Sequence, residues 1–374
     1  MYFEVFNKGS VTNYSINQHD LAIVAFLKRR KFLTSSEIIG HLVKKFGVTE
    51  VNGRQIVNRT ATKKLIYSTK PVSFGKNRFI YYLPGTEIDY DFLLEVCQEH
   101  RPPLYRTLFT LREQGGIMSY FDVLKIASPV LDNSNNHKET LEKIIGELKS
   151  LNLADTVEDD WGGKYIVLND RADFTFQQTI YSLRSQLSTD AMLIPDILRM
   201  LQATNIIDNQ NVTYRNKNTP TLGVNHLNHV WDAVAYTKTT GYNPILAAKA
   251  DTVDKQTLVV IDVLLYRDYT MEDFQGFFDR VQSVRQSVKM GKRKILPVII
   301  YRETDVHTFN TIRKVGFLAF NIGYIYGNRI YDVIANLNKL KASDFEDPQI
   351  DFGKVVADTL LIVKDAGQEV NFLS

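Results

Sequence analysis

One stretch of the chain, from Val51 to Thr86, carries basic side chains and no acidic ones. Cations spaced along one surface neutralise the backbone phosphates of a nucleic acid. Short polar side chains between these cations, such as Asn52, Gln55 and Asn58, can reach the edges of bases. The basic residues of the stretch are Arg54, Arg59, Lys63, Lys64, Lys70, Lys76 and Arg78.

The elements predicted around this stretch would present its side chains to a duplex. An apolar stripe from Leu21 to Leu27 predicts a first helix, and Thr34 with Glu37 predicts a capping box before the second. A third helix and a hairpin around GKN follow, which is the element order of a winged helix. We therefore expect residues 1–88 to bind double-stranded DNA. The expected contacts are Arg54, Asn58, Arg59, Lys63 and Lys64 on the helix, and Lys76 and Arg78 on the hairpin.

The same basic surface has a second interpretation. Charged runs are often solvated faces, and a basic face also fits an acidic partner protein. A protein-interaction scaffold therefore stays open as a third class of function.

A second unit with this element order is predicted for residues 89–171, but its charge is opposite. Its third helix carries Glu139, Glu142 and Glu147, and acidic side chains also occupy its hairpin. Acidic surfaces repel phosphate. We expect this second winged helix to pack against a domain, or to bind a partner protein or a second copy in a homodimer.

Beyond residue 172 the pattern changes to alternating strands and helices, which predicts an α/β domain over residues 172–340 and an extension over 341–374. The predicted fold class is thus a multidomain α+β and α/β chain. The expected strands are HVWDAVAYT, TLVVIDVLLY, KILPVIIYR and LAFNIGYIYG.

Two of these apolar runs contain a carboxylate, Asp232 in the first and Asp262 in the second. A buried carboxylate requires a cation or a raised pKa. Two converging carboxylates can hold Mg²⁺, which orients and acidifies a water molecule for phosphodiester hydrolysis. The cation could instead be a side chain such as Lys249 or Arg267, which would make the site structural.

From Asp173 to about Tyr331 the order of elements resembles the restriction-endonuclease-like PD-(D/E)XK fold. The resemblance implies a Mg²⁺ site made by Asp232 and Asp262, with a catalytic lysine two residues after the second acid. That position is Leu264, and the leading helix offers Gln177 and Gln178 where many members place a glutamate. A migrated lysine, Lys249 or Lys255, could compensate for the missing one.

Two other patterns contain residue types that could bind a metal or DNA. His226 and His229 share a spacing of three with Asp232, but this spacing alternates faces on a strand. The basic run from Lys289 to Lys294 could contact the DNA backbone or form a solvated loop.

Composition sets limits on the function class. With 44% hydrophobic residues and a net charge of +3, the 374 residues indicate a folded chain with two or three domains. A lone cysteine, Cys97, excludes an intramolecular disulfide. The absence of a long apolar run or a signal-peptide pattern predicts a cytoplasmic protein with no membrane partner.

Two hypotheses follow from these patterns. The first is a DNA-binding protein whose nuclease-like domain lacks a complete catalytic motif and needs no cofactor. The alternative is a Mg²⁺-dependent DNA endonuclease of a defence system or mobile element. Its catalytic residues would be Asp232, Asp262 and Lys249.

Overall fold

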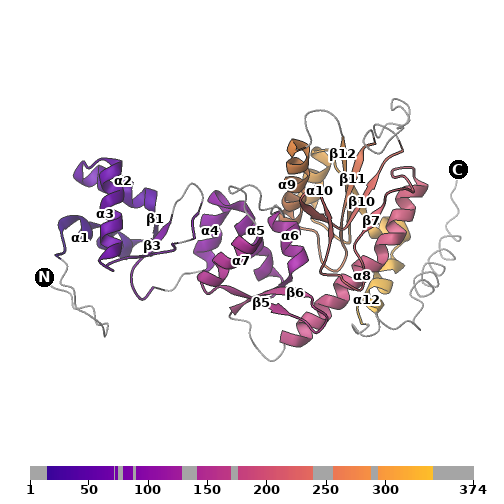
Figure 1. Cartoon of the computed structure of the whole chain (residues 1–374), viewed down its shortest axis with the longest axis horizontal. Helices are drawn as coiled ribbons and strands as arrows, with labels where there is room; N and C mark the ends of the chain where they lie inside the picture. The colour runs from indigo at the N-terminus through magenta and orange to yellow at the C-terminus, as the bar shows by residue number, and fades with distance from the viewer. Residues whose placement is uncertain are drawn as a thin grey trace. The chain divides into compact units, whose positions relative to one another are not determined.

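A computed structural model of the chain divides it into two compact units, Met1–Arg101 and Pro102–Ser374 (Figure 1). It describes residues 15–70, 72–74, 79–86, 90–128, 141–169, 176–238, 256–287 and 294–339. The first unit therefore ends later than the expected boundary at residue 88. Arg101, at this end, donates a hydrogen bond from Nη1 to the Ser73 carbonyl oxygen (3.1 Å) within the unit.

Helices of the first unit begin where the sequence provides caps. Its elements are α1 (Gln18–Arg29), β1 (Phe32–Thr34), α2 (Ser35–Phe46), α3 (Glu50–Thr62), β2 (Tyr67–Ser68), β3 (Ile80–Tyr82) and α4 (Tyr90–His100). The predicted capping box of Thr34 and Glu37 is confirmed at the start of α2. Gly47 ends this helix with φ of 66°, a left-handed conformation that favours glycine.

The core of the first unit lies between its helices and the antiparallel sheet β1-β3-β2. Ile38 of α2 and Ile56 and Val57 of α3 are buried in it. The polar face of α3 is consequently turned away from the core.

The second unit begins with elements in the order helix, strand, helix, helix, hairpin. They are α5 (Pro102–Glu113), β4 (Ile117–Ser119), α6 (Tyr120–Ala127), α7 (Leu141–Ser150), β5 (Ala154–Glu158) and β6 (Lys164–Leu168). We call residues 102–169 the helix-hairpin module. The module and the described residues from 176 onward belong to one compact unit.

The rest of this unit is a five-stranded mixed sheet of order β13-β12-β11-β10-β7. Its strands are β7 (Thr213–Tyr214), β10 (Ala233–Tyr236), β11 (Leu258–Leu264), β12 (Ile295–Tyr301) and β13 (Leu318–Asn321), and the hairpin β8 (Val224–His226) and β9 (His229–Trp231) precedes β10. The helices are α8 (Phe176–Ala203), α9 (Met271–Ser287), α10 (Val306–Lys314), α11 (Ile322–Tyr326) and α12 (Arg329–Leu337). The predicted mixture of α and β structure is confirmed.

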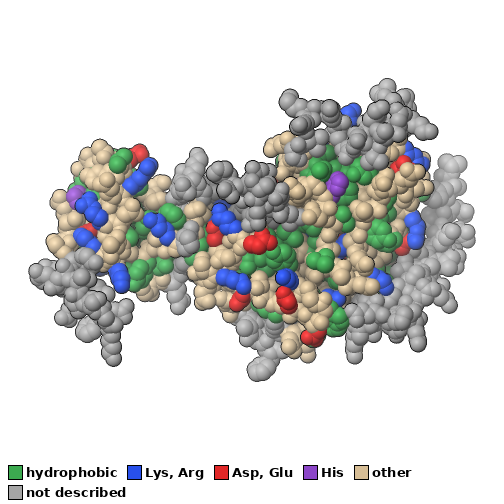
Figure 2. All heavy atoms as spheres, viewed as in Figure 1, with side chains coloured by type: hydrophobic (Ala, Val, Ile, Leu, Met, Phe, Trp, Pro, Cys, Tyr) green, Lys and Arg blue, Asp and Glu red, His purple; other side chains and the backbone are tan. Residues whose placement is uncertain are grey.

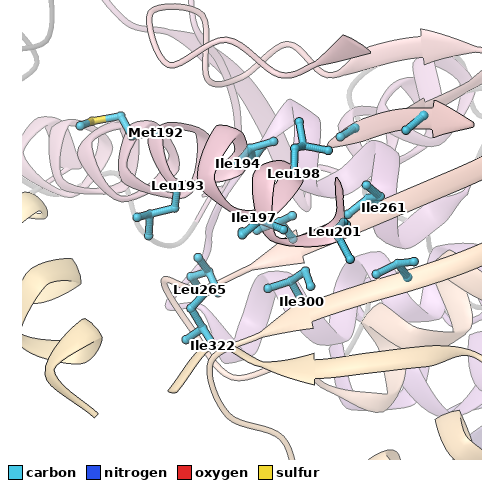
Figure 3. Close-up of a cluster of buried hydrophobic side chains, with 14 of the residues drawn as sticks. Met192, Leu193, Ile194, Ile197, Leu198, Leu201, Ile261, Leu265, Ile300 and Ile322 are labelled. Carbon is cyan, nitrogen blue, oxygen red and sulfur yellow. The ribbon is translucent and has the colours of Figure 1, made fainter. Parts of the chain in front are cut away.

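Helices cover both faces of the sheet (Figure 1), so β11 and β12 are continuously apolar apart from Asp262. Val259, Ile261 and Val263 point to one face, in a cluster with side chains of α8 and α12. Figure 3 shows the α8 side chains of this cluster, among them Ile197 and Leu201, beside Ile261 and Ile300 of the sheet. The opposite face packs against α9 and α10.

Two predicted strands differ from the structure. HVWDAVAYT is divided at Asp232 into β9 and β10, which belong to different sheets. The second predicted strand was wrong in its second half. LAFNIGYIYG is a strand only to Asn321, and α11 begins at the next residue. The Asn321 side chain accepts hydrogen bonds from the backbone N–H groups of Gly323 and Tyr324. This cap starts a helix in a sequence whose apolar content favours a strand.

The predicted extension over residues 341–374 lies outside the described residues. Within the part of the chain that the structure describes, no helix has the length and hydropathy needed to span a membrane.

The module packs closely against α9 at a glycine. A Cβ atom at Gly276 would lie 2.5 Å from the Lys125 carbonyl oxygen and 2.7 Å from the Ile126 carbonyl oxygen. We expect Gly276→Ala to lower the free energy of unfolding of the second unit by about 1 to 3 kcal/mol, because backbone must move. Urea denaturation followed by tryptophan fluorescence measures this, since Trp161 and Trp231 are the two tryptophans of the chain and both lie in this unit.

The matched control is Gly146→Ala on α7, where no atom beyond the neighbouring residues and the helix's own backbone lies within 4 Å of the added Cβ. Because Gly146 is exposed, this substitution should leave the free energy of unfolding unchanged or raise it by up to about 1 kcal/mol. Equal effects of the two substitutions would contradict the close packing of the module on α9.

Candidate functional site

The third helix of the first unit presents a polar and basic face. Arg54, Asn58 and Arg59 are exposed, while Ile56 and Val57 anchor the helix in the core. Arg54 and Asn58 are four residues apart and share one side of the helix. Arg54 lies 3.9 Å from the Glu50 carboxylate, and both side chains are about two-thirds exposed or more (67% and 73%), so this ion pair holds Arg54 weakly.

A groove of about 730 Å³ runs beside this face, between α2, α3 and β3. Lys44, Arg54 and Lys70 are its basic lining residues, and Ser36 and Asn58 add polar groups. Glu50 is the one acidic residue among the lining side chains that the structure describes. In Figure 2, Lys and Arg side chains recur over the described surface of this unit while acidic ones are few. The groove can therefore attract an anion.

The remaining expected DNA contacts are placed differently. The Lys63 ammonium lies 2.6 Å from the Asp20 carboxylate and also donates to the Ser15 carbonyl oxygen (2.8 Å). This lysine ties the end of α3 to the start of α1 and is largely removed from the surface (15% exposed). Lys64 is exposed, at a left-handed position with φ of 58°. Lys76 and Arg78 lie outside the described residues.

The acidic hairpin of the helix-hairpin module contacts α8. Asp159 accepts hydrogen bonds from Tyr165 (2.9 Å) and from Arg184 of α8 (3.1 Å). Asp160 accepts one from Tyr181 of the same helix (2.7 Å), and Trp161 packs edge-on against this tyrosine. The hairpin acids are thus engaged within the unit. Dimerisation or partner binding through this module stays a prediction.

Asp232 and Asp262 are brought together in a buried cluster of five charges. Asp232 lies between β9 and β10, Asp262 lies in β11, and both carboxylates are at most 1% exposed. Lys125 of α6 lies between them, with its Nζ 2.7 Å from Asp232 Oδ2 and 3.1 Å from Asp262 Oδ1. We call Lys125, Arg215, Asp232, Asp262 and Arg280 the buried charge cluster.

Two arginines complete this cluster. Arg215 Nε lies 2.9 Å from Asp232 Oδ1, and Arg280 Nη2 lies 2.9 Å from Asp262 Oδ1. The second Asp262 oxygen accepts from the Tyr269 hydroxyl (3.1 Å). Three cations therefore face two carboxylates, and every oxygen of both carboxylates has a hydrogen-bond donor.

Neighbouring charges shift the pKa values of Asp262 and Lys125 toward their charged forms. Burial alone would raise the pKa of Asp262, but the charges of Lys125 and Arg280 outweigh burial and hold that pKa below its usual value. Burial alone would lower the pKa of Lys125, but the charges of Asp232 and Asp262 outweigh burial and raise that pKa. Asp262 and Lys125 are thus charged at neutral pH.

These residues do not fit a divalent metal. The oxygens that would bind Mg²⁺ already accept from an ammonium, two guanidinium groups and a hydroxyl. The position two residues after Asp262 supplies no cation, because its residue, Leu264, is apolar and buried. Gln177 and Gln178 are exposed on α8, and Lys249 and Lys255 lie outside the described residues. The described part of the chain holds no group of three or more His, Cys, Asp or Glu side chains able to bind a metal.

The two histidines are paired across a hairpin. His226 and His229 are register partners of β8 and β9. Ligation of a metal by these residues together with Asp232 is therefore not supported among the residues described, and Asp232 is bound to Arg215 and Lys125 instead. The lone cysteine, Cys97, is buried.

Sequence patterns did not reveal four charged residues of this region. Lys125 stands in an apolar helix, between Leu124 and Ile126, and Arg280 stands in the apolar stripe of Phe277, Val281 and Val284. A charge inside an apolar stripe signals a buried partner. Arg215 carries no such signal, since it lies in the segment rich in Asn and Thr. The fourth residue is Asp190.

Asp190 is a buried acid on α8, the leading helix of the α/β part. Its Oδ2 accepts from the Leu265 backbone N–H (3.0 Å), and its other oxygen has no partner among the described residues. Burial raises the pKa of Asp190 to about 7, although the charge of Arg215 opposes the increase. The folded protein therefore holds a proton here that the unfolded chain releases near pH 4.

This difference predicts a pH dependence of stability. Because the folded pKa is the higher one, folding becomes less favourable as the pH rises from about 4 to about 7, by about 4 kcal/mol at most. Asp190→Asn keeps the shape and removes the titration. Its free energy of unfolding relative to the wild type should rise between pH 5 and pH 8, as measured by urea denaturation. Parallel pH profiles of the two proteins would contradict the raised pKa.

Comparison of the chain with protein-family models, with curated proteins and with solved structures gives no match.

Proposed function

We propose that the chain binds double-stranded DNA through its first unit, as a winged helix with α3 as the recognition helix. The observation that carries this proposal is the exposed face of α3 beside a groove with three basic lining residues. A helix of this kind enters the major groove, and neighbouring cations contact the backbone.

Individual roles follow from exposure. Arg54, Asn58 and Arg59 face outward and have the side chains that read guanine and adenine edges or bind phosphates. Lys44, Lys64 and Lys70 are exposed and supply backbone contacts. Lys63 acts structurally, because its ammonium is bound to Asp20.

The restriction-endonuclease-like part is proposed to have no hydrolytic role. Asp232 and Asp262 would have to exchange their side-chain cations for a metal and for a water molecule before they could act on phosphate. Opening a buried pair of this kind exposes uncompensated charges and is costly. The α/β part is thus proposed as an assembly domain.

One observation favours the alternative, a Mg²⁺-dependent endonuclease. Hydrolysis of a phosphodiester by such an enzyme requires an ammonium beside the two carboxylates. Lys125 supplies one, although this lysine belongs to the helix-hairpin module. The burial of all three side chains weighs against access of a phosphodiester to them.

Two assays on the full chain test these proposals. Fluorescence anisotropy of a labelled duplex should show binding that weakens as salt increases. Supercoiled plasmid incubated with Mg²⁺ or Mn²⁺ should remain intact. The absence of any salt-sensitive binding would refute the DNA-binding proposal. Metal-dependent nicking that disappears in Asp262→Asn would establish the endonuclease.

A further inference from the structure

The surroundings of the Lys125 ammonium have the composition of a metal site. Its Nζ lies 2.7 Å from Asp232 Oδ2, 3.1 Å from Asp262 Oδ1 and 3.0 Å from the Val263 carbonyl oxygen. Two carboxylates and a backbone carbonyl are oxygen ligands of the kind that hard divalent cations bind. An ammonium has three hydrogen-bond donors, and here three oxygens are within reach of them.

The ammonium is held in this position by the backbone of its helix. The α9 glycine Gly276 packs against the Lys125 carbonyl oxygen, and Arg106 donates a hydrogen bond to the carbonyl oxygen of the next residue, Ile126 (2.8 Å). Arg106 also pairs with Asp279 of α9 (2.8 Å). The side chain itself runs past the Phe121 ring, with Nζ 5.3 Å from the ring centroid. The backbone that carries this side chain is therefore fixed against α9, and the ammonium is buried among its three oxygen partners.

The negative charges in this position are already more than compensated. Lys125, Arg215 and Arg280 supply three positive charges around Asp232 and Asp262. A divalent cation added to this cluster would meet three cations at short range, in a region from which water is excluded. It would have to displace the ammonium in order to bind.

We infer that the Lys125 ammonium is a resident cation that takes the place of a divalent metal between Asp232 and Asp262. The helix-hairpin module is then the part of the chain that supplies this cation, and the α/β part folds without a metal. This inference does not depend on DNA binding by the first unit.

Removal of the resident cation should create a site for a divalent metal. In Lys125→Ala, the oxygens of Asp232, Asp262 and Val263 lose a shared donor and face an open space. We expect this variant to unfold at a lower temperature than the wild type and to recover part of the loss in MnCl₂, but not in NaCl of equal ionic strength. Scanning calorimetry measures both effects.

Electron paramagnetic resonance of free Mn²⁺ tests the same point by a second route. Lys125→Ala should bind one more tight Mn²⁺ than the wild type, and Lys125→Ala combined with Asp262→Asn should not bind it. Should Lys125→Ala fail to fold, Lys125→Gln removes the charge and keeps hydrogen-bond donors, and the same additional Mn²⁺ is expected.

Two results would overturn the inference. The first is tight Mn²⁺ binding by the wild type that Asp262→Asn abolishes, because the position would then belong to a metal in the presence of lysine. The second is a folded lysine variant that neither binds additional Mn²⁺ nor is stabilised by it. Equal effects of Mn²⁺ on the unfolding temperatures of the wild type and the variant would also overturn the inference.

Discussion

Replacing Asp232 with alanine should lower the free energy of unfolding of the second unit by about 3 to 5 kcal/mol, the usual cost of removing one partner from a buried ion pair. Asp232 accepts hydrogen bonds from Arg215, from Lys125 and from the Val263 backbone N–H (2.9 Å). Its removal leaves two buried cations without this carboxylate. The Trp231 ring stacks on the Arg280 guanidinium of the same cluster (4.9 Å), so tryptophan fluorescence during urea denaturation reports the change.

Asp268→Ala is the matched control, because it removes an exposed carboxylate from the same unit. Surface charges of this kind contribute at most about 1 kcal/mol. A similar small effect of both substitutions would contradict the buried charge cluster.

The second large effect concerns DNA. The double substitution Arg54→Ala and Arg59→Ala should lower the affinity for a duplex by at least about tenfold, since each charged interaction with a base contributes about 1 to 3 kcal/mol. The logarithmic salt dependence should also become shallower by about one for each phosphate that the protein no longer neutralises. Anisotropy titrations at several salt concentrations measure both quantities.

A double substitution on the second unit controls for net charge. Arg313 and Arg329 are exposed on α10 and α12, so their change to alanine removes the same charge from residues outside α3. We expect little change in affinity from it. Equal reductions of affinity in the two double variants would mean that binding follows overall charge and not the α3 surface.

Strands β10, β11 and β12 could be predicted because burial on both faces requires continuous apolar runs, whereas the exposed β7 could not. Val259 to Leu264 form such a run, interrupted by Asp262 alone. The N-terminal cap of α2 was equally visible, since Thr34 and Glu37 are local partners. By contrast, α11 depended on the Asn321 side chain, and α8 continues through Pro195 to Ala203 because its apolar side chains pack on the sheet.

The two acids of the buried charge cluster could be predicted, but their cations could not. Lys125 is 107 residues from Asp232 along the chain, and it reaches this carboxylate through the packing of α6 on α9. Sequence spacing holds no information on such a contact. The same limit applies to Lys63, whose position on a helical face predicted a DNA contact, while Asp20, 43 residues away, holds it.

The most direct test of where DNA binds is chemical acetylation of lysines. Mass spectrometry compares the acetylation of each lysine with and without duplex DNA. Lys44, Lys64 and Lys70 are exposed in the first unit, and Lys149 and Lys164 are exposed in the helix-hairpin module (43% and 58%). DNA should protect the first three lysines and leave the other two unchanged. Protection of Lys149 and Lys164 with continued labelling of Lys44 and Lys70 would contradict DNA binding through α3.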